Sequence, residues 1–274
     1  MTNSSPARDS NSRPFPIITA HRGASGLAPE NTLPAIQRAM EAKAEYAEVD
    51  VQVSADGHIV LFHDMTLDRI TGKSGSVRER TWMELQTLDA GEWFHGKFQT
   101  TPPGNSTESI FMSEAPDVRF DGTVIPDLNQ VIDTVRGKMK LNIELKTTNR
   151  ADRLPELVVR LVERKEFVDQ CVVTSSDRAA LQRVKEINPH ITAGYVFSEI
   201  PEKSIWNSEF EWLLPHRQLL RQQLVTRIHA SGKAVHVWTV NEVSEMKNYV
   251  ELGVDGILTD FPDRLVMLRE RYQQ

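Results

Sequence analysis

Charged side chains recur at a two-residue spacing in the sequence. Glu48 and Asp50 stand two apart within the strand-like run 46–53, and residues two apart in a strand share one face of a sheet. Glu144 and Lys146 repeat the spacing at the end of another such run. Three carboxylates on neighbouring strands repel one another unless a cation lies between them, and their oxygens suit Mg²⁺ or Ca²⁺ rather than zinc. The pattern favours one divalent cation bound by Glu48, Asp50 and Glu144.

Two histidines stand where a short apolar run ends, each beside a charged residue. His21 precedes Arg22, and His63 precedes Asp64. Histidine titrates near neutral pH, which suits it to proton transfer. With the carboxylates, Arg22 and Lys146 describe a site for a phosphate group, in which cations neutralise the non-bridging oxygens and histidines move protons. The residue types alone do not distinguish a diester from a monoester, or a hydrolase from an isomerase.

The elements that must position these residues form a repeating pattern. From Ile17 onward, short β-type runs alternate with segments of helical period, as in βα units around a parallel sheet. Eight strands, each followed by a helix, favour a closed TIM-type barrel over an open doubly wound sheet, although strand number alone does not prove closure. The predicted strands are 17–20, 46–53, 140–145, 171–175, 192–197, 210–214, 234–240 and 256–259.

Helix starts are marked by side chains that can accept a hydrogen bond from a free backbone N–H. Asn31 precedes the periodic segment 32–40, and Asp127 and Asn241 stand just before two others. We predict all three as N-cap residues.

Two segments depart from the plain repeat. Residues 58–63 form a further strand-like run, joined to the second strand by the turn-type sequence 54–57, and are expected to extend it as a hairpin. Residues 66–122 form an insertion far longer than the usual βα loop of about 2 to 6 residues. We expect its aromatic residues, Trp93, Phe94 and Phe98, to pack it over the barrel mouth, and its Thr-, Pro-, Ser- and Gly-rich middle to be partly mobile.

Position in this fold decides how the polar residues are interpreted. A bare Glu-x-Asp pair is more often a pair of solvated strand residues, and a lone histidine is more often structural than catalytic. Here the polar residues gather at the carboxyl ends of the strands, which form the active-site face of a TIM barrel. They are His21, Arg22, Glu48, Asp50, Glu144, Lys146, Ser175, Ser176, Trp238, Asn241 and Asp260.

Length and composition fit one barrel. Of 274 residues, 39% are hydrophobic and 26% are charged, and an α/β barrel of roughly 250 residues uses nearly the whole chain. The formal net charge of -6, without a basic cluster, argues against a nucleic-acid partner. The single cysteine, Cys171, excludes an intramolecular disulfide and is expected to be buried.

The beginning of the sequence carries no apolar targeting segment. Residues 1–15 include many Ser, Asn and Arg and lack the apolar core of a signal peptide, so we predict a disordered tail before a barrel domain of residues 16–274. No stretch reaches the roughly 18 apolar residues that a membrane helix needs. We therefore expect a cytoplasmic protein.

Eight short motifs follow one another along the chain. They are His21-Arg22-Gly23, Ala28-Pro29-Glu30-Asn31-Thr32, Glu48-Val49-Asp50-Val51, Phe62-His63-Asp64, Leu67-Asp68-Arg69, Glu144-Leu145-Lys146, Val237-Trp238-Thr239-Val240-Asn241 and Thr259-Asp260-Phe261-Pro262. In this order they resemble the motifs of the glycerophosphodiester phosphodiesterase family. No single motif is decisive, but the ordered set is highly specific.

The resemblance implies an α/β fold, a distorted TIM (β/α)8 barrel, to which this chain adds the long insertion after the second strand. It also implies an enzyme that releases sn-glycerol 3-phosphate from deacylated phospholipids, its small-molecule substrates. At matching positions it assigns proton transfer to His21 and His63, cation binding to Glu48, Asp50 and Glu144, phosphate contact to Arg22 and Lys146, and the wall of the substrate pocket to Trp238. A plainer interpretation of Trp238 is a core aromatic residue.

The sequence leaves two hypotheses for the substrate of an enzyme open, and a third hypothesis is a binding module without activity. The leading hypothesis is metal-dependent hydrolysis of water-soluble glycerophosphodiesters such as glycerophosphocholine or glycerophosphoethanolamine. The alternative, a lysophospholipase D acting on acylated substrates, needs an apolar surface near the mouth, for which Trp93, Phe94 and Phe98 are candidates. An inactive barrel used as a binding module would have lost a histidine or a carboxylate, and all five are present.

Overall fold

The computed structural model describes residues 14–96, 119–148 and 152–273. Its strands are β1 (Ile17–Ala20), β2 (Tyr46–Val53), β3 (Ile59–Leu61), β4 (Lys140–Leu145), β5 (Cys171–Ser175), β6 (Thr192–Phe197), β7 (Trp212–Pro215), β8 (Ala234–Val237) and β9 (Gly256–Thr259). The larger helices are α1 (Leu33–Glu41), α4 (Leu128–Val135), α5 (Leu154–Arg164), α6 (Arg178–Ile187), α7 (Gln222–Ala230), α8 (Val243–Leu252) and α9 (Pro262–Tyr272).

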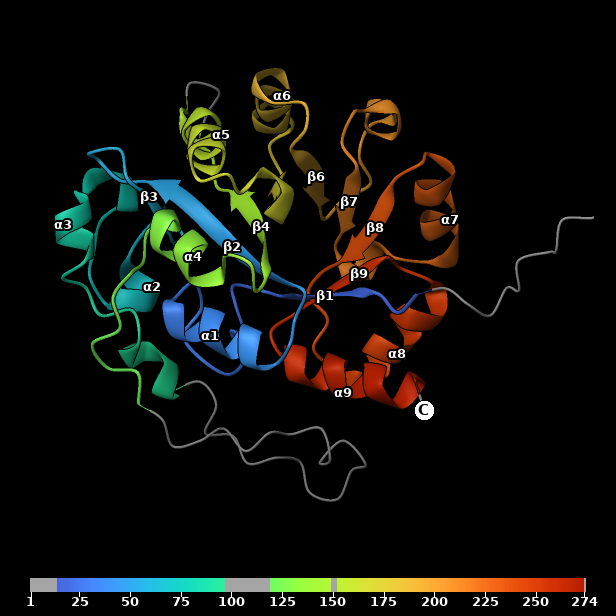
Figure 1. The fold of residues 1–274 in the computed structure, drawn as a ribbon, viewed down its shortest axis with the longest axis horizontal. Coiled ribbons are helices and arrows are strands. Elements are labelled where there is room, and N and C mark those ends of the chain that lie inside the picture. The colour runs from blue at the N-terminus through green and yellow to red at the C-terminus, as the bar shows by residue number, and fades with distance from the viewer. Residues whose placement is uncertain (1–13, 97–118, 149–151, 274) are drawn as a thin grey trace, which may run out of the picture.

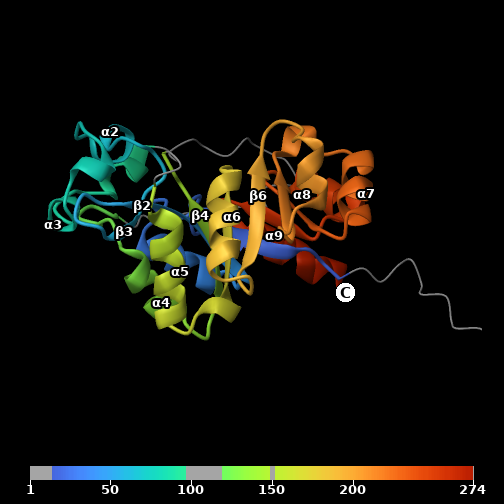
Figure 2. The same ribbon diagram turned by 90° about the horizontal axis from the view of Figure 1, so that it is seen from above.

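The strands form one sheet in the order β1-β9-β8-β7-β6-β5-β4-β2-β3, and a further pairing of β1 with β2 closes it into a barrel. The β2–β3 pairing is antiparallel, and the other pairings are parallel. Helices surround the strands, as Figures 1 and 2 show from two directions. The closed eight-stranded parallel barrel that the sequence predicts is therefore confirmed, and so is the hairpin that extends its second strand.

Two of the eight predicted barrel strands have other bounds in the structure. The seventh strand was placed at 210–214 but runs from Trp212 to Pro215, because the backbone first pairs with β6 where the Glu211 N–H donates to Ala193. The run 234–240 ends as a strand at Val237. There the Trp238 N–H still donates to Pro215 of β7, whereas the Val240 N–H donates to Leu258 of β9, so the chain leaves one neighbour for the other.

Of the three predicted N-caps, only Asp127 is confirmed. Its carboxylate accepts from the Gln130 N–H, and the Gln130 side chain accepts from the Asp127 N–H, which completes a capping box at α4. The predictions for Asn31 and Asn241 were wrong. Thr32 caps α1, and Glu242 precedes α8 without a capping side chain. Both asparagines bind carboxylates of the site instead.

The core has two parts, one on each face of the barrel wall. Outward-facing strand residues pack against the helices in the larger cluster, which includes the buried Phe167 and Phe210. Inside the barrel, aromatic and aliphatic side chains form a second cluster: Tyr46, Val172, Val196, Trp212, Leu214 and Leu258. Cys171 is buried, as its apolar context predicts.

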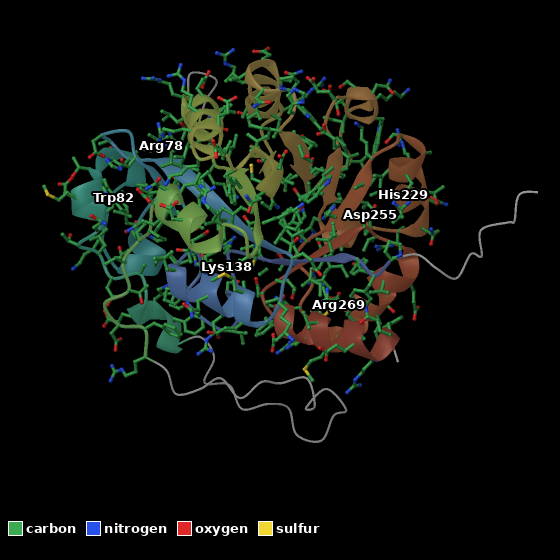
Figure 3. The ribbon with its side chains drawn as sticks, viewed as in Figure 1. Arg78, Trp82, Lys138, His229, Asp255 and Arg269 are labelled. Atoms are coloured by element: carbon green, nitrogen blue, oxygen red, sulfur yellow. The ribbon has the colours of Figure 1, made fainter. Side chains whose placement is uncertain are left out.

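The described part of the insertion forms a small lobe at one side of the barrel (Figure 2). It contains α2 (Asp68–Thr71), η1 (Val77–Glu79), α3 (Trp82–Leu85) and η2 (Glu92–Gly96), packed around their own apolar cluster. Arg78 and Trp82, labelled in Figure 3, lie in it. Phe94 packs against Phe120 and against two alanines, Ala28 before α1 and Ala35 within it, which fixes the lobe to the barrel rim.

Three parts of the sequence predictions fall outside the described residues. They are most of the tail 1–15, the middle of the insertion, and Phe98. Over the described ranges, no helix is both long and apolar enough to cross a bilayer.

His236 on β8 is a titratable group held deep inside the barrel. Its ring stacks on Trp212 with the centroids 3.7 Å apart. Gly256 leaves the space for it, because a methyl group at Gly256 would stand 2.0 Å from His236 Nδ1. Neither ring nitrogen has a hydrogen-bond partner among the described residues. Burial, only partly offset by Asp255, lowers the pKa of His236 to about 3, so the ring stays neutral in the folded protein.

We predict that His236 makes the fold sensitive to acid. In the unfolded chain its pKa lies near the ordinary 6.5. Between pH 6.5 and pH 3 the unfolded state therefore binds more protons than the folded state, and the free energy of unfolding decreases as the pH is lowered. His236→Leu abolishes this contribution. The free energy of unfolding of the wild type minus that of the variant, from urea denaturation, should fall by about 2 kcal/mol between pH 7.5 and pH 5. A difference that does not change with pH would contradict the prediction.

Candidate active site

A cavity of about 250 Å³ opens at the carboxyl ends of the barrel strands. Its charged side is formed by residues that the sequence analysis singled out, and its other side is apolar. The lining residues are His21, Arg22, Asp50, His63, Glu144, Lys146, Ser176, Val196, Phe197, Ser198, Leu214, Trp238 and Leu258. Of the eight predicted site residues, seven therefore line one cavity, and the eighth, Glu48, lies beside it.

Three carboxylates converge because of strand register. Asp50 of β2 is paired directly with Glu144 of β4, and Glu48 stands two residues earlier on the same face of β2. Ligand oxygens of the three lie within 4.8 Å of one another. Glu48 and Asp50 are 0% and 1% exposed, so water does not screen their repulsion. Burial, and then the charge of Asp50, raise the pKa of Glu48 to about 8.

Two basic side chains compensate part of this negative charge. Lys146 Nζ lies 2.6 Å from Glu144 Oε1 and 3.0 Å from Asp50 Oδ1. Arg22 Nε lies 3.3 Å from Asp50 Oδ2, and the Asn31 amide donates to the same oxygen. Although burial alone would raise the pKa of Asp50, Lys146 and Arg22 hold it well below its usual range. Burial likewise opposes the charge on Lys146, but Asp50 and Glu144 raise its pKa.

The donor set fits a hard divalent cation. Glu48 Oε2 accepts the Arg22 N–H at 2.7 Å, whereas Glu48 Oε1 is buried without a hydrogen-bond partner among the described residues. A buried carboxylate oxygen left without a partner is costly. Glu48 belongs to the same group of carboxylates as Asp50 and Glu144, and carboxylate oxygens are the ligands that Mg²⁺ and Ca²⁺ prefer.

The loop after β1 adopts an unusual backbone to reach these carboxylates. Arg22 and Asn31 both lie in the left-handed region, with φ of 54° and 57°. The Asn31 N–H donates to the Arg22 carbonyl, which closes the loop on itself. As a result, the side-chain carbonyl of Asn31 accepts the Asp50 N–H while its amide donates to Asp50 Oδ2. Such conformations cost about 1 to 3 kcal/mol each and tend to occur at functional sites.

His21 is oriented by Asp260, which follows β9. His21 Nδ1 lies 2.7 Å from Asp260 Oδ1, and Ser25 and Asn241 also donate to this carboxylate. A carboxylate only accepts hydrogen bonds, so Nδ1 carries the proton and Nε2 is left for chemistry. Burial opposes the charged form of the ring, but the hydrogen bond and the charge of Asp260 outweigh it and raise the pKa of His21.

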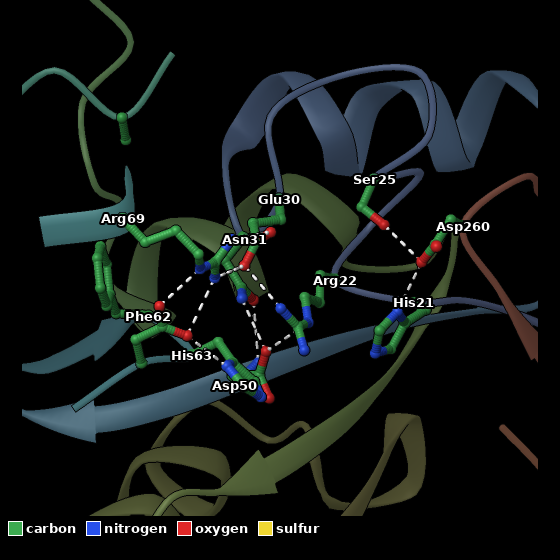
Figure 4. Close-up of polar contacts among 12 residues, drawn as sticks. His21, Arg22, Ser25, Glu30, Asn31, Asp50, Phe62, His63, Arg69 and Asp260 are labelled. Carbon is green, nitrogen blue, oxygen red and sulfur yellow. Dashed lines mark hydrogen bonds and ion pairs between the residues drawn. The ribbon is translucent and has the colours of Figure 1, made fainter. Parts of the chain in front are cut away.

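His63 is brought back to the site by the β2–β3 hairpin. The Phe62 N–H donates to the Asp50 carbonyl, which places His63 next to the carboxylates of β2. The fully buried Gln52 donates to the carbonyls of Phe62 and Asp64 and so fixes the segment. His63 Nδ1 lies 2.7 Å from Asp64 Oδ1, an arrangement that again leaves Nε2 for chemistry (Figure 4).

Trp238 bounds the apolar side of the cavity. Its indole N–H donates to the Leu214 carbonyl at 2.8 Å, and its ring meets that of His216 edge to face. Of the two serines predicted at the rim, Ser176 lines the cavity, whereas Ser175 is buried and its hydroxyl binds the Leu145 carbonyl. Ser175 is thus a structural residue.

Known proteins support this picture. Residues 21–264 match the model of the glycerophosphoryl diester phosphodiesterase family. The chain belongs to this family. Its members are phosphoric diester hydrolases, so the chain is an enzyme of that class. A glycerophosphodiester phosphodiesterase of Caldanaerobacter subterraneus subsp. tengcongensis is 31% identical over 257 residues, which cover 92% of this chain and 97% of that protein.

Solved structures of family members share the fold. A phosphodiesterase of Oleispira antarctica, in complex with the product sn-glycerol-3-phosphate, matches with a TM-score of 0.77 and 27% identity, covering 94% of this chain and 97% of that one. The glycerophosphodiester phosphodiesterase of Agrobacterium tumefaciens matches with a TM-score of 0.73 and 26% identity, covering 92% and 100%.

Several residues of the site were not assigned a role from the sequence. Gln52 had a usable signal, because it continues the two-residue spacing of Glu48 and Asp50 on β2. Glu30 and Arg69 belong to the family motifs, but no role was predicted for them. Their spacing does not indicate that their side chains form a hydrogen bond across 39 residues.

We predict that Asp260 sets the protonation of His21. In Asp260→Asn the carboxylate charge is lost while an oxygen remains to accept from Nδ1, so burial dominates and the pKa of His21 should fall below that of the wild type. An NMR titration of the histidine ring carbons measures it. Ser25→Ala removes a partner of Asp260 but keeps its charge, and should leave His21 nearly unchanged. An equally high pKa in Asp260→Asn would show that Asp260 is not responsible.

Proposed function

We propose that this chain hydrolyses water-soluble glycerophosphodiesters to an alcohol and sn-glycerol 3-phosphate in the cavity described above. Membership of the family supports the reaction class, and the product bound to the Oleispira antarctica relative indicates the glycerol phosphate half of the substrate. The observation that carries the proposal is the arrangement of two carboxylate-bound histidines and three clustered acidic oxygens around one cavity.

The residues that hold the substrate divide by charge. Arg22 and Lys146 would bind the non-bridging phosphate oxygens, since both line the cavity and both are fixed by Asp50. Glu48, Asp50 and Glu144 would hold Mg²⁺ or Ca²⁺. When bound, the cation would neutralise charge on the phosphoryl oxygens and acidify a hydroxyl group. Trp238 would form the wall beside the organic part of the substrate.

The two histidines would act as the acid/base pair. One Nε2 accepts the proton of the attacking hydroxyl, and the other Nε2 donates a proton to the departing alcohol. Glycerophosphodiesters carry a hydroxyl on glycerol C2, tethered near phosphorus, so internal attack avoids much of the entropic cost of positioning water. A bond forms from this oxygen to phosphorus as the bond to the departing alcohol breaks. Water then opens the resulting cyclic phosphate.

The acylated alternative has less support in the described residues. It relied on Trp93, Phe94 and Phe98 as an apolar surface. Phe94 is 8% exposed and packs into a core cluster, and the Trp93 indole N–H donates to the Ala90 carbonyl. Phe98 lies outside the described ranges. A cavity of about 250 Å³ suits a head group and a glycerol phosphate better than a long acyl chain.

Removing the charge of one acidic ligand should weaken the binding of the cation. We predict that Glu144→Gln weakens the binding of Mg²⁺ and Ca²⁺ to metal-stripped protein by roughly 100-fold, because one of three charged ligands is lost. Titration calorimetry measures this. Glu41→Gln, the same change on an exposed residue at the end of α1, serves as the control. Wild-type affinity in Glu144→Gln, and also in Asp50→Asn, would place the cation elsewhere.

Activity itself is tested with glycerophosphocholine and glycerophosphoethanolamine, with added Mg²⁺, added Ca²⁺ or EDTA. The products are followed by ³¹P NMR, which resolves the diester, a cyclic phosphate and glycerol phosphate. We expect hydrolysis that stops in EDTA. If neither compound is hydrolysed with either cation, but a lysophospholipid is, the acylated alternative replaces the proposal.

Internal attack predicts a strict need for the C2 hydroxyl. A diester of the same head group that lacks this hydroxyl should react at least about 1,000-fold more slowly, because the tethered nucleophile is lost. The comparison of kcat/KM values measures it, and binding of the analogue as a competitive inhibitor shows that it still enters the site. An analogue hydrolysed as fast as the parent compound would indicate direct attack by water.

A further inference from the structure

Arg69 lies outside the cavity but connects two of the residues that line it, His63 and Arg22. This residue of the short helix α2 forms paired hydrogen bonds with two carboxylates at once (Figure 4). Its Nε and one terminal nitrogen donate to Asp64 at 2.6 and 3.0 Å. Both terminal nitrogens donate to Glu30, at 2.9 and 2.7 Å. A planar guanidinium is the side chain that can bind two carboxylates in this way.

Each of these carboxylates holds one side chain of the site. Asp64 accepts from His63 Nδ1, and Glu30 accepts from a terminal nitrogen of Arg22 at 2.7 Å. The chain of contacts therefore runs from His63 through Asp64, Arg69 and Glu30 to Arg22.

The energetics of Glu30 make this connection more than a surface ion pair. Exposed pairs contribute little to stability, and Arg69 is itself 38% exposed. Glu30, however, is 8% exposed, and both its oxygens are bound by guanidinium groups. Although burial opposes its charged form, Arg69 and Arg22 lower the pKa of Glu30. Without Arg69, one oxygen of a mostly buried carboxylate loses its donor, and Glu30 no longer connects the Arg22 side chain to Asp64 and His63.

Arg69 also contacts an aromatic ring elsewhere in the insertion. The guanidinium carbon of Arg69 lies 5.7 Å from the centroid of the Trp93 ring, within the range of a cation–π interaction. Trp93 belongs to η2, and its ring packs beside Phe94, which joins the lobe to the rim.

We propose that Arg69 is a positioning residue for the reaction, which fixes the His63 ring relative to the Arg22 side chain through Asp64 and Glu30. The inference rests on the proposed function, because it needs His63 to transfer a proton and Arg22 to bind phosphate. Arg69 itself touches neither substrate nor cation. Its loss therefore acts mainly on kcat, since Arg22 keeps its own contacts with Glu30 and Asp50 and continues to bind phosphate.

A double-mutant cycle tests whether Arg69 acts through His63. With glycerophosphocholine as substrate, Arg69→Met should lower kcat by roughly 10- to 100-fold, the range typical of groups that orient a functional histidine through a carboxylate, and should raise KM less. In a His63→Ala background the same change should alter kcat by less than about threefold, because the ring to be positioned is gone. A full loss in both backgrounds, or no loss in either, overturns the proposal.

Arg183→Met is the matched control. Arg183 also bridges two carboxylates, Glu156 and Glu186, but does so on the outside of α5 and α6. We expect wild-type kcat and KM from it. Thermal unfolding of both methionine variants shows whether any loss of activity comes from the fold.

A measurement without substrate keeps the inference separate from the proposed activity. In Arg69→Met the ring ¹⁵N chemical shifts of His63, assigned from the signals missing in His63→Ala, should move, and in Arg183→Met they should not. Unmoved His63 shifts in Arg69→Met overturn the positioning role whatever the substrate is. Shifts that move in a protein without phosphodiesterase activity would instead retain the contact and reject the proposed function.

Discussion

Mutual repulsion among Glu48, Asp50 and Glu144 is the constraint around which the rim of this barrel is built. Two like charges about 4 Å apart repel by roughly 4 kcal/mol at a typical effective dielectric, and two of these carboxylates are buried. Arg22 and Lys146 offset two of the three negative charges. Compensation is incomplete, because burial and Asp50 still raise the pKa of Glu48, and a bound dication would stabilise its ionised form. The electrostatics of the rim thus favour binding of a cation.

Compensating these carboxylates shapes the backbone. To bring Arg22 and Asn31 to Asp50, the loop after β1 accepts two non-glycine residues in the left-handed region. Gly23 makes this possible, with φ of 76°, because a methyl group there would lie 2.7 Å from the Ala35 carbonyl carbon. The strain is held in place by hydrogen bonds from the Gly23 N–H to Glu48 and from the Asn31 N–H to Arg22. Hydrogen bonds therefore fix the backbone of the loop at Arg22.

Sequence reasoning succeeded where a signal is local and periodic. Six of the eight predicted strands have the observed bounds, because buried parallel strands are apolar runs between turn and helix signals. Sequence reasoning failed where a residue that could cap a nearby helix instead binds a residue far away in the sequence. Asn31 and Asn241 look like N-caps, yet their amides bind Asp50 and Asp260, each 19 residues away. Spacing also could not join His21 to Asp260, 239 residues apart, because only the pairing of β1 with β9 brings them together.

The insertion supports the site from two directions. Arg69 comes from its first helix and reaches the His63 side of the cavity through Asp64. Arg78 comes from η1, donates to the Lys146 carbonyl and pairs with Asp152 at 2.6 Å. Both guanidiniums are fixed to a lobe that has its own apolar core. A barrel of short βα loops would leave the segments around His63 and Lys146 without these anchors, so the described part of the insertion supports the candidate active site.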